Sequence, residues 1–446
     1  MKILLPLIVL GLLVWPPAPM AALDTMGTAE ETPKIWTAEE AVTFAIAGNP
    51  DNTIARKRIE EAQAAAMLAR ATDYPLINVS AEYGQTNSPM YSFGNILNQG
   101  TFNNSINFNN PGITDNLQLK AVVNYRIYNG GQDQAEHAAS AARIGASESD
   151  LVAVHQQLGF EVVKTFQAIV QAEKMVAVRL EELSAITTSL DVGRARYEAG
   201  DLLRQDLLNL ELQQSRASEN LIQSRHTLEL SKRSFLNLLG LQQGNVRIDP
   251  AGGRTLQLPG TVDYRNRHEL QKLEAMFQVA EAELKKAEGS RKPTLDAFAG
   301  YQVDSGFIEV ESGNSWMAGM KVNYALFDGH KAAAQISLAR LKLQEIQGLK
   351  LKTELALNLE VQQALLDYKQ AEERLSVTDK MVAVAEEVAR LSRARFKEGV
   401  ILASELIDLE MRLTDARARQ LTAKAGYQVA IANLRRATGS AQFADN

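Results

Sequence analysis

The sequence contains no cysteine, and this one absence excludes several classes of protein. A disulfide-stapled domain, a cysteine-ligated metal site, a thiol nucleophile and a lipid-modified N-terminal cysteine all need that side chain. Aromatic residues make up only 6% of the chain, whereas Ala, Leu, Glu, Gln, Lys and Arg are abundant. This composition favours long helices over a compact mixed core. The net charge is −6 and no basic block occurs, so nucleic acid is not expected as a partner.

The sequence also lacks the motifs of common catalytic sites. It has no glycine-rich nucleotide loop, no Gly-x-Ser-x-Gly and no His-Glu-x-x-His. The five histidines are scattered, which is typical of helix-surface or packing residues, and the eleven methionines do not cluster. We therefore predict that the protein is not an enzyme and has no cofactor or metal site.

Only the N-terminus carries a long apolar run. One lysine precedes the run Ile3–Trp15, which is too short to span a bilayer comfortably, and small residues follow it. Pro16, Pro17 and Pro19 would break a continuing helix. We predict a signal peptide over residues 1–22 and hence export; the alternative is an uncleaved anchor.

The most informative feature of the sequence is an internal repeat. The stretch Arg194–Glu211 returns 199 residues later as Arg393–Glu410, with eight of eighteen positions identical. The same offset aligns Val123–Gly131 with Val322–His330 without a gap. A duplicated unit of this length indicates that one structural motif is built twice in the chain.

Each unit is expected to contain a helix, two strands and a long helical hairpin. We predict a first repeat over residues 23–240, a Pro/Gly-rich linker over 241–264, a second repeat over 265–439 and a tail over 440–446. The expected helices and strands are helices near 37–72 and 267–289, strands near 77–83, 117–127, 295–301 and 316–326, and long helices near 132–197 and 331–396. The first repeat has about 19 additional residues between its strands, in a polar stretch expected to be a loop.

The strands alternate apolar and polar residues, which suits a sheet between lipid and water. Leu117, Leu119, Ala121 and Val123 share one face, opposite Gln118 and other polar residues. Four strands leave open edges, and open edges are not tolerated in hydrocarbon. Three chains would supply twelve strands for one closed barrel, so we predict a homotrimer in contact with membrane lipid.

The order of these parts, present twice, resembles the TolC family of trimeric outer-membrane channels. The resemblance rests on the repeat, on the junctions NYRIYNGG and NYALFDGH, and on the two Gly-containing corners. It implies a mainly α fold with a twelve-stranded membrane β-barrel and a long helical tunnel through the periplasm. It also implies a role as the exit duct of a tripartite efflux or type I secretion system, with a periplasmic adaptor and an inner-membrane pump. The alternative is a periplasmic coiled-coil adaptor or a structural envelope protein.

The corners around Gly200 and Gly399 would form the tips of the tunnel, because glycine readily adopts the left-handed conformation that ends a helix. We expect the turns to meet the adaptor and the leucines after each glycine to set the returning helix. The expected tip residues are Gly200, Leu203, Leu207, Gly399, Leu402 and Leu406.

The resemblance also implies that Glu405 and Asp408 line the narrow periplasmic end of the tunnel, and that Asp206 and Phe396 help to hold it shut. Alternatively, the two acids merely occupy a first helical turn, where they favour the helix dipole. Ile401 stands where some members of the family have an arginine. Arg393 or Arg395 could take the place of this arginine.

Overall fold

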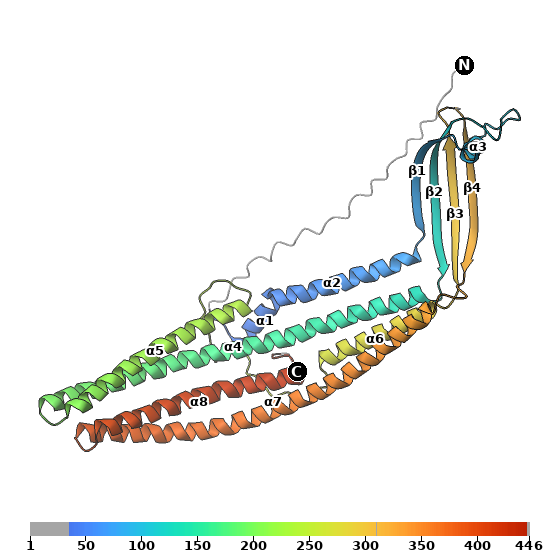
Figure 1. Cartoon of the computed structure of the whole chain (residues 1–446). Coiled ribbons are helices and arrows are strands. Elements are labelled where there is room, and N and C mark those ends of the chain that lie inside the picture. Colours follow the sequence, from blue (N-terminus) through green and yellow to red (C-terminus); the bar gives the residue numbers. More distant parts are fainter. Residues whose placement is uncertain (1–34, 309, 444–446) are drawn as a thin grey trace.

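The computed structural model describes residues 35–308 and 310–443 (Figure 1). The chain is elongated, with a four-stranded sheet at one end and two long helical hairpins that reach the other end. The predicted signal peptide over residues 1–22 and the last three residues of the predicted tail lie outside the described residues. Among the described helices, none combines the length and the apolarity needed to cross a membrane.

The two halves of the chain share the order helix, strand, strand, long helix and returning helix, and the first half has additional short helices. The first half contains α1 (Ala38–Gly48), α2 (Pro50–Arg70), a 3₁₀ turn (Ala71–Asp73), β1 (Leu76–Thr86), α3 (Pro89–Asn98), β2 (Thr114–Tyr128), α4 (Gln132–Glu198) and α5 (Arg204–Leu238). The second half contains α6 (His268–Gly289), β3 (Thr294–Ser305), β4 (Ser312–Asn323), α7 (Lys331–Lys397) and α8 (Ala403–Ala437). Helices α4 and α7 both have 67 residues, and α5 and α8 both have 35.

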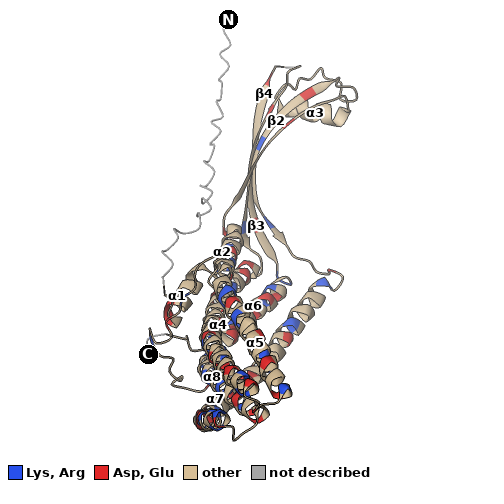
Figure 2. Ribbon diagram, turned by 90° about the vertical axis from the view of Figure 1, so that its left-hand side faces the viewer, with Lys and Arg blue, Asp and Glu red and all other residues tan. Residues whose placement is uncertain are grey.

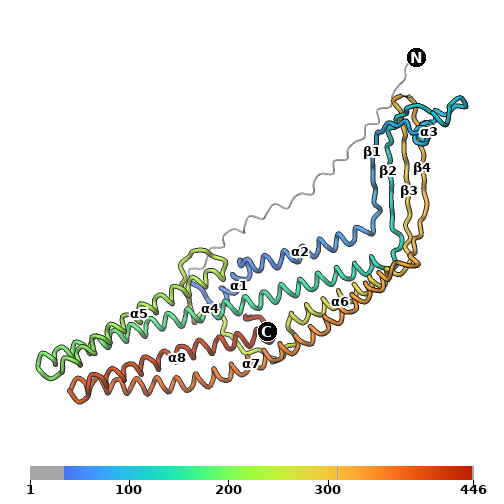
Figure 3. Tube along the Cα trace, viewed as in Figure 1, coloured from blue at the N-terminus to red at the C-terminus, as the bar shows by residue number. Residues whose placement is uncertain are grey.

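The long helices follow from the absence of internal proline and from helix-favouring residues. At about 1.5 Å per residue, α4 and α7 each extend for roughly 100 Å. Helix α5 packs on α4, α8 packs on α7, and α8 also lies against α4, so the two hairpins run side by side (Figure 3).

The first predicted helix is two helices in the structure. Asn49 ends α1 and caps α2, because its side-chain oxygen accepts a hydrogen bond of 2.8 Å from the Asp51 amide. Pro50 occupies the first position of α2, where a missing N–H costs nothing. The chain therefore turns at Asn49 instead of continuing as one helix.

The four strands form one antiparallel sheet in the order β1-β2-β3-β4. This confirms the four predicted strands, but β4 ends at Asn323 and not near residue 326 as the sequence suggested. Asn323 pairs with Thr294, the first residue of β3. Thr294 follows Pro293, which has no N–H group to continue the hydrogen bonds between β3 and β4. Figure 2 shows few charged residues on the strands and many on the helices.

The additional residues of the first repeat were expected to be a loop, but they contain the helix α3. Pro89 takes the first helical position after Ser88, an arrangement that favours helix initiation. Ser92 and Ile96, one turn apart on α3, are buried. The helix therefore has a packed side, which the polar composition of the surrounding stretch concealed.

The largest apolar core lies midway along the helices, where α1, α4, α5 and α8 meet. Trp36, Phe166 and Phe235 are almost fully buried there, and Trp36 contacts the Phe235 ring edge-to-face at 6.1 Å between centroids. The segment before α1 is tied to the inter-repeat linker by a bridge between Trp36 and Ile248. This core fixes the point from which the hairpins extend.

The repeat is also visible in how each hairpin ends. The Asn49 side chain donates to the Leu238 carbonyl at 2.8 Å, and the Arg267 guanidinium donates to the Ala437 carbonyl at 3.2 Å. In both halves the residue just before the short helix thus satisfies a carbonyl at the end of the returning helix. Arg267 is buried, which by itself would lower its pKa, but its pairing with Glu269 and Glu360 raises the pKa overall.

Gly240→Ala should destabilise this junction. Gly240 has φ of +77°, and an added Cβ would lie 2.7 Å from the Gly48 carbonyl oxygen. The left-handed conformation alone costs a non-glycine residue about 1–2 kcal/mol, and the contact adds to this. Thermal unfolding of the purified protein in detergent, followed by helical circular dichroism, should show a lower Tm. As a control, Gly145→Ala in α4 meets nothing within 4 Å and should raise Tm or leave it unchanged.

Candidate functional site

The candidate site consists of the two turns at the far ends of the hairpins. Gly200 and Gly399 have φ of +85° and +76°, and both are in the left-handed conformation predicted for them. The amide of the next residue bonds back to the helix in each turn, from Asp201 to the Arg196 carbonyl at 2.8 Å and from Val400 to the Arg395 carbonyl at 2.9 Å. The two turns therefore have the same backbone geometry.

The predicted tip leucines divide into two groups. Leu203 and Leu402 stand just before α5 and α8 and are 71% and 66% exposed. Leu406 is only 1% exposed and packs in a cluster with Phe396, while Leu207 packs against the same cluster. The exposed surface of the tips therefore includes Leu203 and Leu402, whereas Leu207 and Leu406 hold the hairpins together.

In each hairpin, an arginine on the long helix pairs with a glutamate on the returning helix, at equivalent positions of the two repeats. Arg194 approaches Glu211 at 3.7 Å, and Arg393 bonds Glu410 through two contacts of 2.5 and 2.7 Å. The hydrogen bond to Glu410 raises the pKa of Arg393. Arg393 thus joins α7 to α8 within one hairpin.

The contact between the two tips is made by Arg196, which the sequence did not single out as a gate residue. Its guanidinium lies 5.2 Å from the centre of the Phe396 ring and donates to the Phe396 carbonyl at 3.1 Å. It also donates to the Asp201 carbonyl at 3.3 Å, and an added Cβ on Gly399 would lie 3.3 Å from it. One side chain therefore connects the first turn, the end of α7 and the second turn.

The sequence did contain a sign that Arg196 matters, because Arg-Ala-Arg precedes the turn in both repeats. Its partner could not be identified without the fold, since the Phe396 carbonyl is 200 positions away along the chain. The C-terminal end of a helix such as α7 carries a partial negative charge, which attracts a cation.

The acidic residues lie on a different side of the tip. Glu405 and Asp408 are exposed in the first turns of α8, and their spacing of three places them on one face. Asp408 also pairs with Arg412 at 2.9 Å. Asp206 is half-buried in the first turn of α5, and Phe396 is 2% exposed beneath Arg196. The structure therefore brings Phe396 to the contact between the tips and leaves Glu405 and Asp408 at the surface.

Arg417 makes a second connection between the hairpins. Its guanidinium contacts Glu181 on α4 and Glu386 on α7, the latter at 2.9 Å. Three helices from both hairpins thus converge on one side chain.

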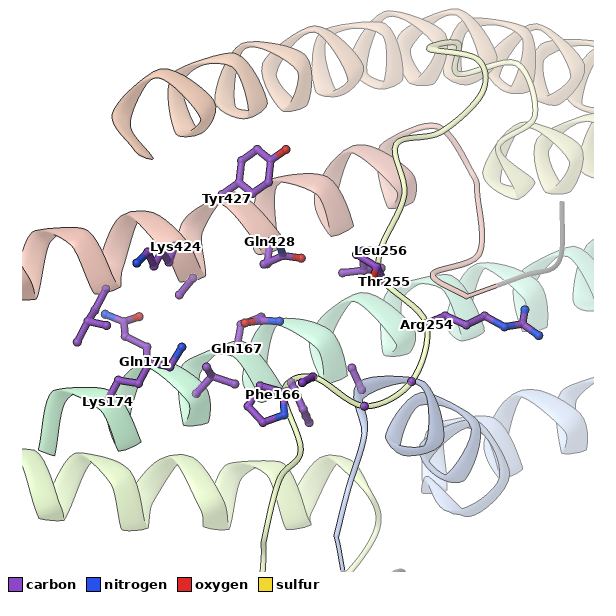
Figure 4. Close-up of a pocket in the computed structure, with 18 of the residues that line it drawn as sticks. Phe166, Gln167, Gln171, Lys174, Arg254, Thr255, Leu256, Lys424, Tyr427 and Gln428 are labelled. Carbon is purple, nitrogen blue, oxygen red and sulfur yellow. The ribbon is translucent and has the colours of Figure 1, made fainter. Parts of the chain in front are cut away.

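A cavity of about 360 Å³ lies near the middle core, between α4, α8 and the linker (Figure 4). Lys174 and Lys424 stand at one side of it and Arg254 at the other, with Gln167 and Gln428 between them. None of the predicted site residues lines this cavity. It is therefore separate from the tips.

Comparison with known proteins agrees with this architecture. The chain is 23% identical over 379 residues to nodulation protein T of Rhizobium leguminosarum bv. trifolii, covering 82% of this chain and 76% of that protein. It is 22% identical over 427 residues to protein CyaE of Bordetella pertussis, covering 91% and 83% of the two chains.

Solved structures give the same fold. The outer-membrane protein VceC of Vibrio cholerae superposes with a TM-score of 0.78 at 15% identity, over 91% of this chain and 97% of that one. CusC superposes with a TM-score of 0.79 at 17% identity, over 90% and 92% of the two chains.

The description "Outer membrane efflux protein" belongs to a family model that matches residues 42–241 and 264–440. The matched segments cover both repeats and leave out most of the linker. This confirms the resemblance drawn from the sequence: the chain belongs to the outer membrane efflux protein family, that of the TolC-type channels.

Proposed function

We propose that three copies of this chain form an outer-membrane exit duct that receives cargo from an inner-membrane pump through a periplasmic adaptor. Family membership supports a duct for efflux or secretion over the alternative of a coiled-coil adaptor. The observation that carries the trimer is the open sheet: β1 and β4 are edge strands, and both are largely exposed. In a barrel, β1 of one copy would pair with β4 of the next.

Exposed leucines on α7 support the same assembly. Leu355, Leu359 and Leu366 are 64%, 57% and 65% exposed, and their spacing places them along one side of the helix. A soluble surface seldom leaves such a stripe open, so we assign it to contacts with a neighbouring copy. Both the sheet edges and this stripe would be buried by the same trimer.

Leu359→Glu should therefore weaken the trimer, because the new carboxylate would be buried without a partner. The matched control is Asn358→Glu, an exposed position about 100° around the helix. Native mass measurement in mild detergent should find three chains for the parent and the control, and smaller species for Leu359→Glu. A parent protein that is monomeric and still conducts ions would overturn the proposed function.

At the periplasmic end, we assign to Arg196 the closing of the tips. Its contacts to the Phe396 ring and carbonyl hold the two hairpins of one chain together. The exposed Leu203 and Leu402 are assigned to adaptor contact, since they protrude from the turns. Adaptor binding at the turns could then separate the hairpins by competing with Arg196.

Arg196→Ala should open the tips and increase single-channel conductance in planar bilayers. The change removes one hydrogen bond and one cation–π contact between the hairpins, each worth about 1 kcal/mol, together with a hydrogen bond to Asp201 inside the first hairpin. Arg194→Ala serves as the control, because Arg194 pairs only loosely with Glu211 inside its own hairpin. Equal conductance in both variants would place the closing contact elsewhere.

We also assign Glu405 and Asp408 to the narrow end of the tunnel. Three copies would bring six carboxylates to one ring, and like charges at close range attract cations. The equivalent positions of the first repeat are Asp206 and Asn209, so the second hairpin carries the greater negative charge.

The double variant Glu405→Ala/Asp408→Ala should reduce cation selectivity and weaken block by multivalent cations added from the periplasmic side. Asp415→Ala provides the control: Asp415 pairs with Arg419 four residues on, as Asp408 pairs with Arg412, but it lies two turns farther from the tip. Reversal potentials in salt gradients measure the selectivity. If selectivity and block are unchanged in the double variant, the carboxylate ring does not exist.

A further inference from the structure

One transverse row of paired residues identifies the polar face of the sheet near its outer end. Glu82 pairs with Gln118, Gln118 with Asp304, and Asp304 with Gly313. Side chains of directly paired residues point to the same face of a sheet. Three of these four residues are polar, so this face is the one that would line the water-filled interior of a barrel.

Helix α3 lies on this polar face. A Cβ added to Gly313 would fall 1.9 Å from the carbonyl oxygen of Asn98, the last residue of α3, so the helix end touches β4 on that side. The next residue, Gln99, donates to the Asn116 side chain at 3.1 Å, two positions before Gln118 on β2. The helix thus contacts both β2 and β4 at the end of the sheet.

Several polar contacts fix α3 in this position. The Ser92 hydroxyl is fully buried and lies 3.0 Å from the carbonyls of both Thr86 and Gly112. The Asn95 amide donates to the Thr114 hydroxyl at 3.0 Å. Since each such bond contributes about 1 kcal/mol, α3 is docked on the sheet and does not hang free.

From these contacts we infer that α3 lies inside the outer mouth of the duct and narrows it, an inference that rests on the proposed trimer. Three copies would place three helices within one mouth. A helix with its side chains is about 10 Å across. The diameter of a barrel grows with its number of strands: side chains fill a barrel of about eight strands, whereas barrels of about 16–18 strands leave an open channel. A twelve-stranded barrel has an intermediate diameter, so three helices would occupy much of its mouth.

The solvent side of α3 is apolar, with Met90 and Tyr91 84% and 70% exposed. The connection between β3 and β4 is far shorter than that between β1 and β2. Among the described residues, only the strand pair β1–β2 therefore carries such a helix. A mouth of this kind passes small solutes, whereas a polypeptide or a large molecule requires α3 to move aside. The docking of α3 therefore sets a size limit on what leaves the duct.

The absence of cysteine allows a direct test on cells. Ser80→Cys places a single thiol deeper on the polar face, where Ser80 pairs with Lys120. A small maleimide and a bulky polymer-linked maleimide are added outside, and the labelling rates are compared. We expect slow labelling by the bulky reagent in the parent.

Gly313→Ala should raise the rate of bulky labelling about tenfold, because the added methyl group overlaps the Asn98 carbonyl and increases the population with α3 displaced. Gly84→Ala is the matched control: it lies on the same polar face of β1, and its Cβ meets nothing within 4 Å. Replacing residues 89–110 by a short Gly-Ser linker provides a second variant, with the same expected increase.

The outcomes separate the inference from the proposed function. Fast bulky labelling in the parent trimer, or equal rates in all variants of an intact trimer, would overturn the narrowing of the mouth and leave the duct in place. A parent chain that forms no trimer would overturn the proposed function and this inference with it.

Discussion

The constraint on which the rest of the structure depends is the backbone of the two sheet edges. Strands β1 and β4 each present N–H and C=O groups that water can satisfy but hydrocarbon cannot. A single chain of this family therefore has no stable place in a membrane by itself. In the proposed trimer, pairing these edges between copies closes a ring, and the ring would fix where each long hairpin starts. The length of α4 and α7 would then decide how far the proposed duct extends.

Most of the fold was predictable from the sequence, because it is governed by local and periodic signals. Proline-free amphipathic stretches specified α4 and α7, and alternation specified the strands. Glycines at the turns marked Gly200 and Gly399, whose left-handed conformations no other residue adopts at so little cost. Duplication strengthened these signals, since each pattern appears twice and in the same order. Patterns that depend on a few neighbouring residues can be read without the fold.

What the sequence could not provide were contacts between distant segments. Helix α3 is stabilised by bonds to Thr114 and Asn116 across the sheet, and the polar stretch around it suggested only a loop. The sequence suggested Arg393 and Arg395 as possible gate arginines, whereas the contact of Arg196 with Phe396 on the other hairpin became visible only in the structure. Arg393 is engaged with Glu410 inside its own hairpin. These partners are set by how two hairpins lie side by side, which periodicity does not encode.

The two repeats have similar backbone folds, so positions at which their side chains or insertions differ are candidates for functional roles. Asn49 and Arg267 perform the same capping task at equivalent junctions with unlike side chains, which is a difference without an evident mechanical consequence. At the turns, by contrast, Arg196 of the first hairpin donates to the Phe396 carbonyl of the second, whereas Arg395, its equivalent in the second hairpin, has no counterpart to this bond among the described residues. At the other end, only the first strand pair carries a helix. In the proposed trimer, these differences would reduce a six-fold arrangement of hairpins to three-fold symmetry at both ends of the duct. Selective opening requires unequal contacts of this kind, because six identical hairpins would offer no weaker interface at which to part.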